Sequence, residues 1–135
     1  ILIKTTVPSN LPKELEIEMA LIAGKILNKL DYIGVMGIEF FVTSQGLILN
    51  EFAPRVHNSG HWTLDGCLIN QFEQHIRAIS GWPLGSTKRH SNIVMTNIIG
   101  EKITTDIKEN QSIYSYGKKE IRAGRKMGHI NTIYE

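Results

Sequence analysis

Two acidic residues, Glu39 and Glu51, lie in neighbouring segments that are rich in β-branched and aromatic residues. The segments 33–42 and 47–53 have the composition of strands, and the polar, glycine-containing stretch 43–46 separates them. This pattern is typical of a β-hairpin. The hairpin therefore decides whether the two carboxylates lie far apart or side by side.

The register of the hairpin depends on its turn. A three-residue loop ending at Gly46, with that glycine in the left-handed conformation, is a common connection. It pairs Thr43 with Leu47 and places Glu39 directly opposite Glu51. Directly opposed side chains in antiparallel strands have Cβ atoms roughly 4.5–5.5 Å apart.

Two carboxylates at that separation destabilise a sheet unless a cation, a donor or a proton compensates them. A hard divalent ion can bridge two carboxylates and the phosphate oxygens of a substrate, and magnesium is the usual ion. The sequence therefore predicts a metal site at Glu39 and Glu51. The surrounding residues are largely apolar and leave few other donors: Phe40, Phe41, Leu49 and Phe52.

Two alternatives remain open at this stage. Each glutamate could instead pair with a separate basic residue, for which Arg55 is a candidate. A two-residue loop would shift the register and place Asn50, not Glu51, opposite Glu39.

Many polar side chains follow the hairpin within a few residues. Pro54 and Gly60 disfavour a helix there, so the spacing of His57 and His61 is not the helical metal-binding pattern. We expect an irregular loop at the strand end, where ligand sites are frequent. The alternative is a capping loop that satisfies backbone groups. The candidate ligand-binding side chains are Arg55, His57, Asn58 and Ser59.

A basic stretch, 117–129, carries five positive charges and one negative charge. Four of its basic residues could hold a phosphate group: Lys118, Arg122, Arg125 and Lys126. The alternatives are a solvated basic hairpin or a nucleic-acid patch, although only Tyr114 and Tyr116 are available nearby to stack on bases.

The elements that position these residues define an α+β chain without internal repeats. An apolar stripe predicts a helix from about residue 12 to 30, and a second stripe predicts another from about 63 to 80. Later strands are expected at 92–99, 112–116 and 130–134. We predict two parts: residues 1–85, with a helix-flanked antiparallel sheet, and a small β-rich lobe at 86–135.

The composition excludes several classes of protein. With 41% hydrophobic and 21% charged residues, the chain resembles a soluble globular protein, and no apolar run is long enough for a membrane span. A single cysteine, Cys67, excludes an internal disulfide and fits a reducing cytoplasm. The net charge of +2 is too small to indicate nucleic-acid binding by itself.

The motifs together resemble the C-terminal part of the N5-carboxyaminoimidazole ribonucleotide synthetase family, ATP-grasp enzymes of purine biosynthesis. The resemblance covers about residues 11–131. Its most specific part is the run from Asn50 to Thr63, and the segments 34–42, 71–85 and 116–129 support it.

The resemblance implies that ATP phosphorylates bicarbonate and that the product carboxylates aminoimidazole ribonucleotide. It implies magnesium ions at Glu39 and Glu51, with Asn50 and Glu51 at the ATP. It implies Arg55, His57, Asn58 and Ser59 at the reacting groups, with Arg55, His57 and Asn58 as catalytic residues. It implies that Lys118 and Arg125 bind the 5′-phosphate of the ribonucleotide. The family is expected to be cytoplasmic and homodimeric, without nucleic-acid or membrane partners.

The alternatives are another ATP-grasp ligase of purine synthesis, using formate or glycine, or a nucleic-acid-binding module using Lys118–Lys126. Because the chain opens at Ile1 on a β-rich stretch with no obvious partner nearby, we expect a segment of a longer protein. The family's nucleotide-clamping parts precede this region, so we expect the segment alone to be inactive.

Overall fold

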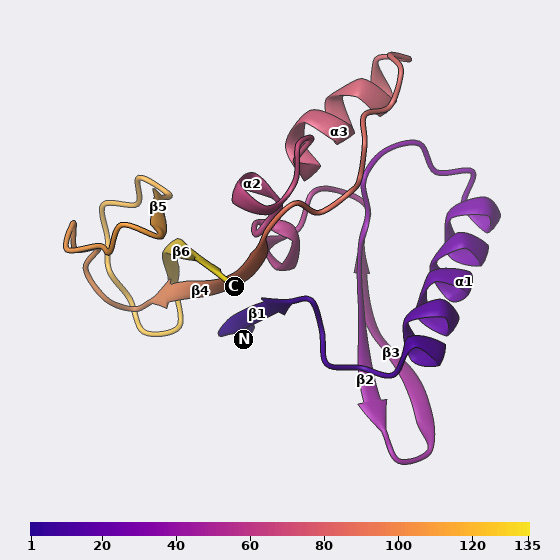
Figure 1. Cartoon of the computed structure of the whole chain (residues 1–135), viewed down its shortest axis with the longest axis horizontal. Coiled ribbons are helices and arrows are strands. Elements are labelled where there is room, and N and C mark those ends of the chain that lie inside the picture. The colour runs from indigo at the N-terminus through magenta and orange to yellow at the C-terminus, as the bar shows by residue number, and fades with distance from the viewer. The chain divides into compact units, whose positions relative to one another are not determined.

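The computed structural model describes all residues 1–135, which form three α-helices, a short 3-10 helix and six strands arranged in two antiparallel sheets (Figure 1). The predicted α+β class is confirmed at this level. The residues group into two compact units, one of residues 1–8, 61–70 and 86–135 and one of residues 9–60 and 71–85. We describe each unit by itself.

The first unit is built on a four-stranded sheet in the order β1-β4-β6-β5. Its buried apolar core includes Ile93 and Met95 of β4, both 0% exposed. A four-residue helix, α2, also belongs to this unit. The elements are β1 (Lys4–Val7), α2 (Thr63–Gly66), β4 (Asn92–Ile99), β5 (Gln111–Ser115) and β6 (Lys126–Tyr134).

The opening strand β1 pairs antiparallel with β4, which lies far away in the sequence. The residues near the start of the chain therefore group with the later β-rich region, as do residues 61–70. The predicted division at residue 85 follows the order of the chain, whereas these units follow contacts. Strand β6 starts at Lys126, within the basic stretch 117–129 and before the predicted start at residue 130.

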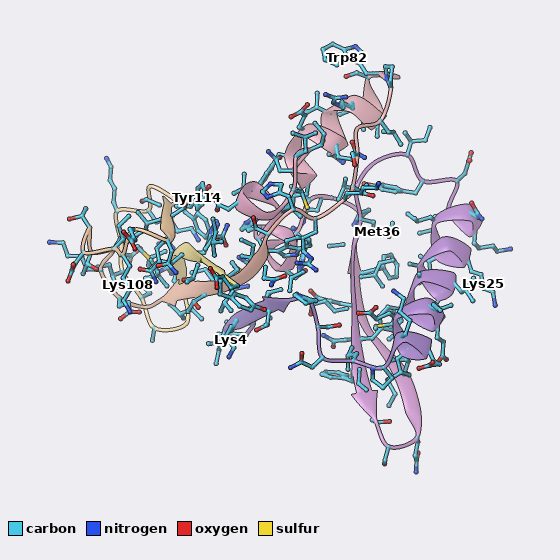
Figure 2. The ribbon with its side chains drawn as sticks, in the orientation of Figure 1. Lys4, Lys25, Met36, Trp82, Lys108 and Tyr114 are labelled. Carbon is cyan, nitrogen blue, oxygen red and sulfur yellow. The ribbon has the colours of Figure 1, made fainter.

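The second unit contains the hairpin and two longer helices: α1 (Lys13–Lys29), β2 (Gly37–Thr43), β3 (Gly46–Ala53), the 3-10 helix (Asn58–Gly60) and α3 (Gln71–Ile79). Helix α1 confirms the predicted helix and lies alongside the hairpin, with side chains between them (Figure 2). Ile26, Leu30 and Phe52 line a cavity of about 490 Å³ there. Because side chains alternate along a strand, Phe52 lies on the face of β3 opposite to Glu51.

The prediction of one helix from about 63 to 80 is wrong. Helix α2 ends at Gly66, and Cys67 is extended with φ −130° and ψ 149°. Cys67 forms an isolated bridge with Arg89, and the Gly66 carbonyl accepts a hydrogen bond of 2.8 Å from the His90 amide. Helix α2 ends where this pairing with a later segment begins, and α3 starts only at Gln71.

None of the helices combines the length and the apolar character that a membrane span requires.

Candidate functional site

Glu39 and Glu51 lie directly opposite each other in the hairpin, as predicted, but for a different reason. The loop has two residues, and Thr43 pairs with Gly46 rather than with Leu47. That register alone would place Asn50 opposite Glu39. A β-bulge corrects it, because Asn50 has no partner in the ladder between the pairs Phe40–Leu49 and Glu39–Glu51.

The bulge gathers polar groups on one part of the hairpin. The extra residue of a bulge re-aims neighbouring side chains, and bulges are frequent next to active sites. Here the Asn50 side-chain amide donates a hydrogen bond of 3.3 Å to Glu39 Oε2. Both positions that the sequence left open, Glu51 and Asn50, therefore lie beside Glu39.

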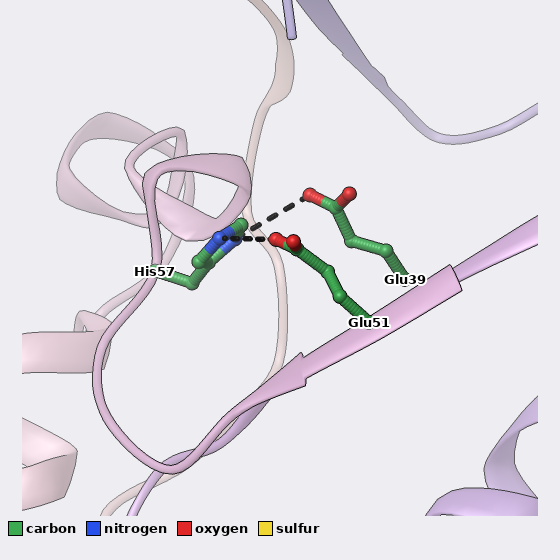
Figure 3. Close-up of side chains that lie close together, drawn as sticks. All are labelled: Glu39, Glu51 and His57. Carbon is green, nitrogen blue, oxygen red and sulfur yellow. Dashed lines mark ion pairs between the residues drawn. The ribbon is translucent and has the colours of Figure 1, made fainter. Parts of the chain in front are cut away.

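His57 contacts both carboxylates (Figure 3). Its Nδ1 atom lies 3.5 Å from Glu39 Oε1, and its Nε2 atom lies 3.3 Å from Glu51 Oε1. The His57 side chain is 12% exposed, against 27% for Glu39 and 56% for Glu51. The imidazole is therefore the most buried of the three side chains, and Glu51 is the most exposed to solvent.

The alternative in which Arg55 pairs with a glutamate is not seen in the structure. The Arg55 guanidinium donates a hydrogen bond of 2.9 Å to the carbonyl of the next residue, Val56. The neighbouring basic side chain that contacts the glutamates is His57. The sequence indicated that the loop was polar, but not which of its side chains turns back to the hairpin.

Two neighbours hold the His57 side chain in place. Ser59 Oγ lies 2.8 Å from His57 Nδ1, and the Ser59 amide points to the same nitrogen at 3.4 Å. Gly37 lies against the ring, since a β-carbon at this position would come within 2.5 Å of His57 Cβ and 2.7 Å of Cγ. Any larger residue at position 37 would displace the imidazole.

The donor set fits a divalent cation. One ligand atom each from Glu39, Glu51 and His57 can be chosen so that all lie within 4.8 Å of one another. Carboxylate oxygens are the donors that magnesium prefers, and the imidazole nitrogen adds a softer one. The carboxylates therefore suit magnesium, with His57 at the edge of the site.

The other predicted phosphate ligands, Lys118 and Arg125, belong to the first unit. Lys118 Nζ donates a hydrogen bond of 2.6 Å to the Lys126 carbonyl and lies 5.5 Å from the centre of the Tyr116 ring. It lines a cavity of about 280 Å³ that also contains the side chains of Lys102 and Lys119. The structure thus brings together three lysines, of which Lys102 and Lys119 were not predicted.

Arg125 makes different contacts. Its guanidinium donates to the Glu120 carbonyl at 3.2 Å and lies 3.5 Å from the Glu120 carboxylate, which also contacts Arg122 at 3.4 Å. A ligand phosphate at Arg125 would therefore compete with Glu120.

A partly buried polar cluster in the first unit was not predicted. The Asp65 carboxylate accepts hydrogen bonds from the Ser112 and Tyr114 hydroxyls and from Asn131 Nδ2, the last at 2.6 Å. Burial raises the pKa of Tyr114, and the Asp65 charge adds to this effect. The four residues lie on α2, β5 and β6, so only the tertiary fold brings them together.

His129 lies beside this cluster and is 1% exposed. Its ring stacks on Tyr114 at 4.7 Å and lies 4.9 Å from the His61 ring, while Nδ1 contacts the Tyr116 hydroxyl at 2.9 Å. Burial lowers the pKa of His129 to about 4, with a further contribution from His61. His129 is therefore neutral at physiological pH.

Comparison with known families assigns the class. The ATP-grasp domain family matches residues 1–72, and the phosphoribosylaminoimidazole carboxylase C-terminal domain matches residues 93–135. The chain belongs to the ATP-grasp family, whose matched region includes the hairpin, both glutamates and the His57 loop.

Individual relatives narrow the likeness to one kind of enzyme. The chain is 54% identical to N5-carboxyaminoimidazole ribonucleotide synthase from Brucella melitensis, over 98% of this chain and 38% of that protein. The crystal structure of the synthetase from Thermus thermophilus matches with a TM-score of 0.92 and 41% identity, over 99% of this chain and 38% of that one.

A more distant structure carries ligands. The synthase from Aspergillus clavatus, in complex with ADP and 5-aminoimidazole ribonucleotide, matches with a TM-score of 0.90 and 33% identity, over 99% of this chain and 39% of that one. The chain thus spans less than two fifths of the length of each of these relatives.

Proposed function

We propose that the intact protein containing this chain catalyses the ATP- and bicarbonate-dependent carboxylation of 5-aminoimidazole ribonucleotide to its N5-carboxy form. The observation that carries this proposal is the cluster of Glu39, Glu51 and His57, built by a bulged hairpin. The similarity to N5-carboxyaminoimidazole ribonucleotide synthases along almost the whole chain supports the choice of reaction.

Glu39 and Glu51 are the residues that would hold Mg²⁺ carrying the ATP phosphates. When bound, the ion neutralises negative charge on the phosphoryl group that is transferred. The opposed carboxylates supply two hard oxygen donors and attract the cation because their mutual repulsion is otherwise only partly compensated. The Asn50 amide, hydrogen-bonded to Glu39, restrains one of them, and we assign Asn50 to the nucleotide site.

The proposed reaction has two steps. An oxygen of bicarbonate takes the γ-phosphoryl group of ATP, which gives carboxyphosphate and ADP. The amine of 5-aminoimidazole ribonucleotide then attacks the carboxyl carbon, directly or after release of CO2. Inorganic phosphate leaves, and the amine loses a proton to a base.

The loop after the hairpin is assigned to the reacting groups. Arg55 offers a planar cation for a phosphate or carboxylate oxygen, and Asn58 and Ser59 offer neutral donors. The His57 imidazole can accept the amine proton, because a neutral imidazole carries one nitrogen that acts as an acceptor.

We assign the 5′-phosphate of the ribonucleotide to Lys118 and Arg125. The three-lysine cavity at Lys118 supplies the positive charge that a phosphate needs. A cytoplasmic homodimer without nucleic-acid or membrane partners completes the proposal, in keeping with the family resemblance.

Carboxylation can be measured with ¹³C-labelled bicarbonate. The intact protein is expected to form ADP only when bicarbonate is present. When 5-aminoimidazole ribonucleotide is added as well, the label is expected in an N-carboxylated product. Replacement of bicarbonate by formate or glycine tests the other ATP-grasp ligases. ADP formation with one of these, and none with bicarbonate, would contradict the proposal.

A further inference from the structure

Gln71 is the most buried side chain of the second unit. It is 7% exposed and is the only buried residue of that unit, although it is polar. A buried amide must satisfy both its oxygen and its nitrogen, or it lowers stability by about 1–3 kcal/mol. The partners of Gln71 therefore indicate what this side chain does.

Both ends of the Gln71 amide bind the backbone of His57. The His57 N–H donates to Gln71 Oε1, and Gln71 Nε2 donates to the His57 carbonyl, each at 2.9 Å. Two parallel hydrogen bonds fix orientation as well as distance. They fix the residue whose imidazole contacts both Glu39 and Glu51.

The packing around the amide is equally close. A β-carbon at Gly60, the last residue of the 3-10 helix, would come within 2.6 Å of Gln71 Oε1. The loop that carries His57, Asn58 and Ser59 is therefore folded against Gln71.

We propose that Gln71 is a positioning residue that sets the His57 imidazole against the Glu39–Glu51 pair. Gln71 acts through its two hydrogen bonds with the His57 backbone. Its effect on turnover rests on the proposed function, but its effect on the position of His57 does not.

The same helix also holds the hairpin. His75, one turn after Gln71, accepts a hydrogen bond of 3.0 Å at Nδ1 from the Val35 amide, just before β2. Residues four apart lie on one face of a helix. With this one face, α3 therefore contacts both the segment before β2 and the loop that carries His57. The position of His57 relative to the hairpin thus depends on one rigid element.

Gln74 provides a matched control. Its amide makes the same two-point contact with the backbone of Gly85, where Gly85 N donates to Oε1 at 2.9 Å and Nε2 donates to the Gly85 carbonyl at 3.1 Å. Gln74→Met and Gln71→Met therefore remove equivalent hydrogen bonds from the same helix. Only Gln71→Met frees His57.

The first measurement is the NMR signal of the His57 imidazole in the intact protein, assigned by its loss in His57→Asn. We expect it to shift in Gln71→Met and to stay in place in Gln74→Met. Should Gln71→Met fail to fold, Gln71→Glu keeps the acceptor for the His57 amide and loses the donor to its carbonyl, and the same shift is expected. An unmoved His57 signal in a folded Gln71 variant would overturn the proposal.

The second measurement is kcat for carboxylation. Gln71→Met should lower kcat by about 10–100-fold, as for other residues that orient a site group, and Gln74→Met should not. In a His57→Asn background, Gln71→Met should cause no further loss, because both changes act on one group. Equal losses in both glutamine variants, or a Gln71→Met loss that persists without His57, would contradict the positioning role. A moved His57 signal without carboxylation by the wild type would instead refute the proposed function alone.

Discussion

Asn50 donates its hydrogen bond to Glu39 from the single position of β3 that has no partner in the hairpin ladder. The extra residue offsets the short turn and brings Glu51 opposite Glu39. A regular hairpin with the same two-residue loop would pair Glu39 with Asn50. The carboxylate pair is therefore a product of the bulge.

The close approach of Gly37 to His57 predicts a specific cost of adding a methyl group there. Gly37→Ala should lower the free energy of unfolding by about 1–3 kcal/mol, because the new β-carbon would overlap His57. Denaturant unfolding measures the change. Gly24→Ala in α1 is the control, since nothing lies within 4 Å of a β-carbon there, and it should raise stability by about 0.5–1 kcal/mol. A neutral Gly37→Ala would argue against the described position of His57.

The Asp65 cluster should be important for stability. Asp65→Asn replaces an acceptor of three donor side chains with a group that is itself half donor, and should cost about 1–3 kcal/mol. Asp106→Asn, at an exposed position, should leave the unfolding midpoint unchanged. Equal midpoints for the two variants would show that the cluster contributes little.

The low pKa of His129 predicts a dependence of stability on pH. Below pH 6.5 the unfolded chain binds a proton at this histidine, whereas the folded chain does so only near pH 4. Stability should therefore fall as the pH drops from 6.5 to about 4, by up to about 3 kcal/mol from this residue.

The measurement is urea unfolding across this pH range in the wild type and in His129→Asn. The variant keeps a polar atom for Tyr116 but cannot titrate, so its stability should depend less on pH. Parallel curves for the two proteins would contradict the assignment to His129.

The cavity at Lys118 predicts a selective binding defect. If Lys118 holds the ribonucleotide phosphate, Lys118→Met should raise the KM for 5-aminoimidazole ribonucleotide by about tenfold or more and leave the KM for ATP unchanged. Lys88→Met, at an exposed lysine, is the control. A rise in both KM values would place the defect in the fold rather than in a phosphate site.

Local patterns in the sequence were sufficient for α1, for β4 and for the hairpin, because each depends on neighbouring residues. The pairing of Glu39 with Glu51 was also predicted correctly, yet from a three-residue loop that the structure does not contain. Two departures from the assumed geometry, a shorter turn and a bulge at Asn50, cancel each other. Neither the shorter turn nor the bulge can be predicted from the pattern of hydrophobic residues.

The remaining features depend on distant contacts. The break after Gly66 requires the partner strand segment at Arg89 and His90, and the apolar stripe from 63 to 80 continues across it. The hydrogen bonds between Gln71 and His57 span fourteen residues and join a side chain to the backbone. The periodicity of apolar residues in the sequence therefore does not predict them. Strand β1 likewise finds its partner only in β4.

We propose that Glu39 and Glu51 jointly hold a divalent cation. Mn²⁺ binding to the intact protein, followed by electron paramagnetic resonance, is the direct test. We predict a Mn²⁺ site that is weakened at least about tenfold in Glu39→Gln and in Glu51→Gln, because each removes one carboxylate ligand. Glu18→Gln, at an exposed glutamate of α1, should bind as the wild type does. Unchanged Mn²⁺ affinity in both hairpin variants would show that the two carboxylates do not hold the ion.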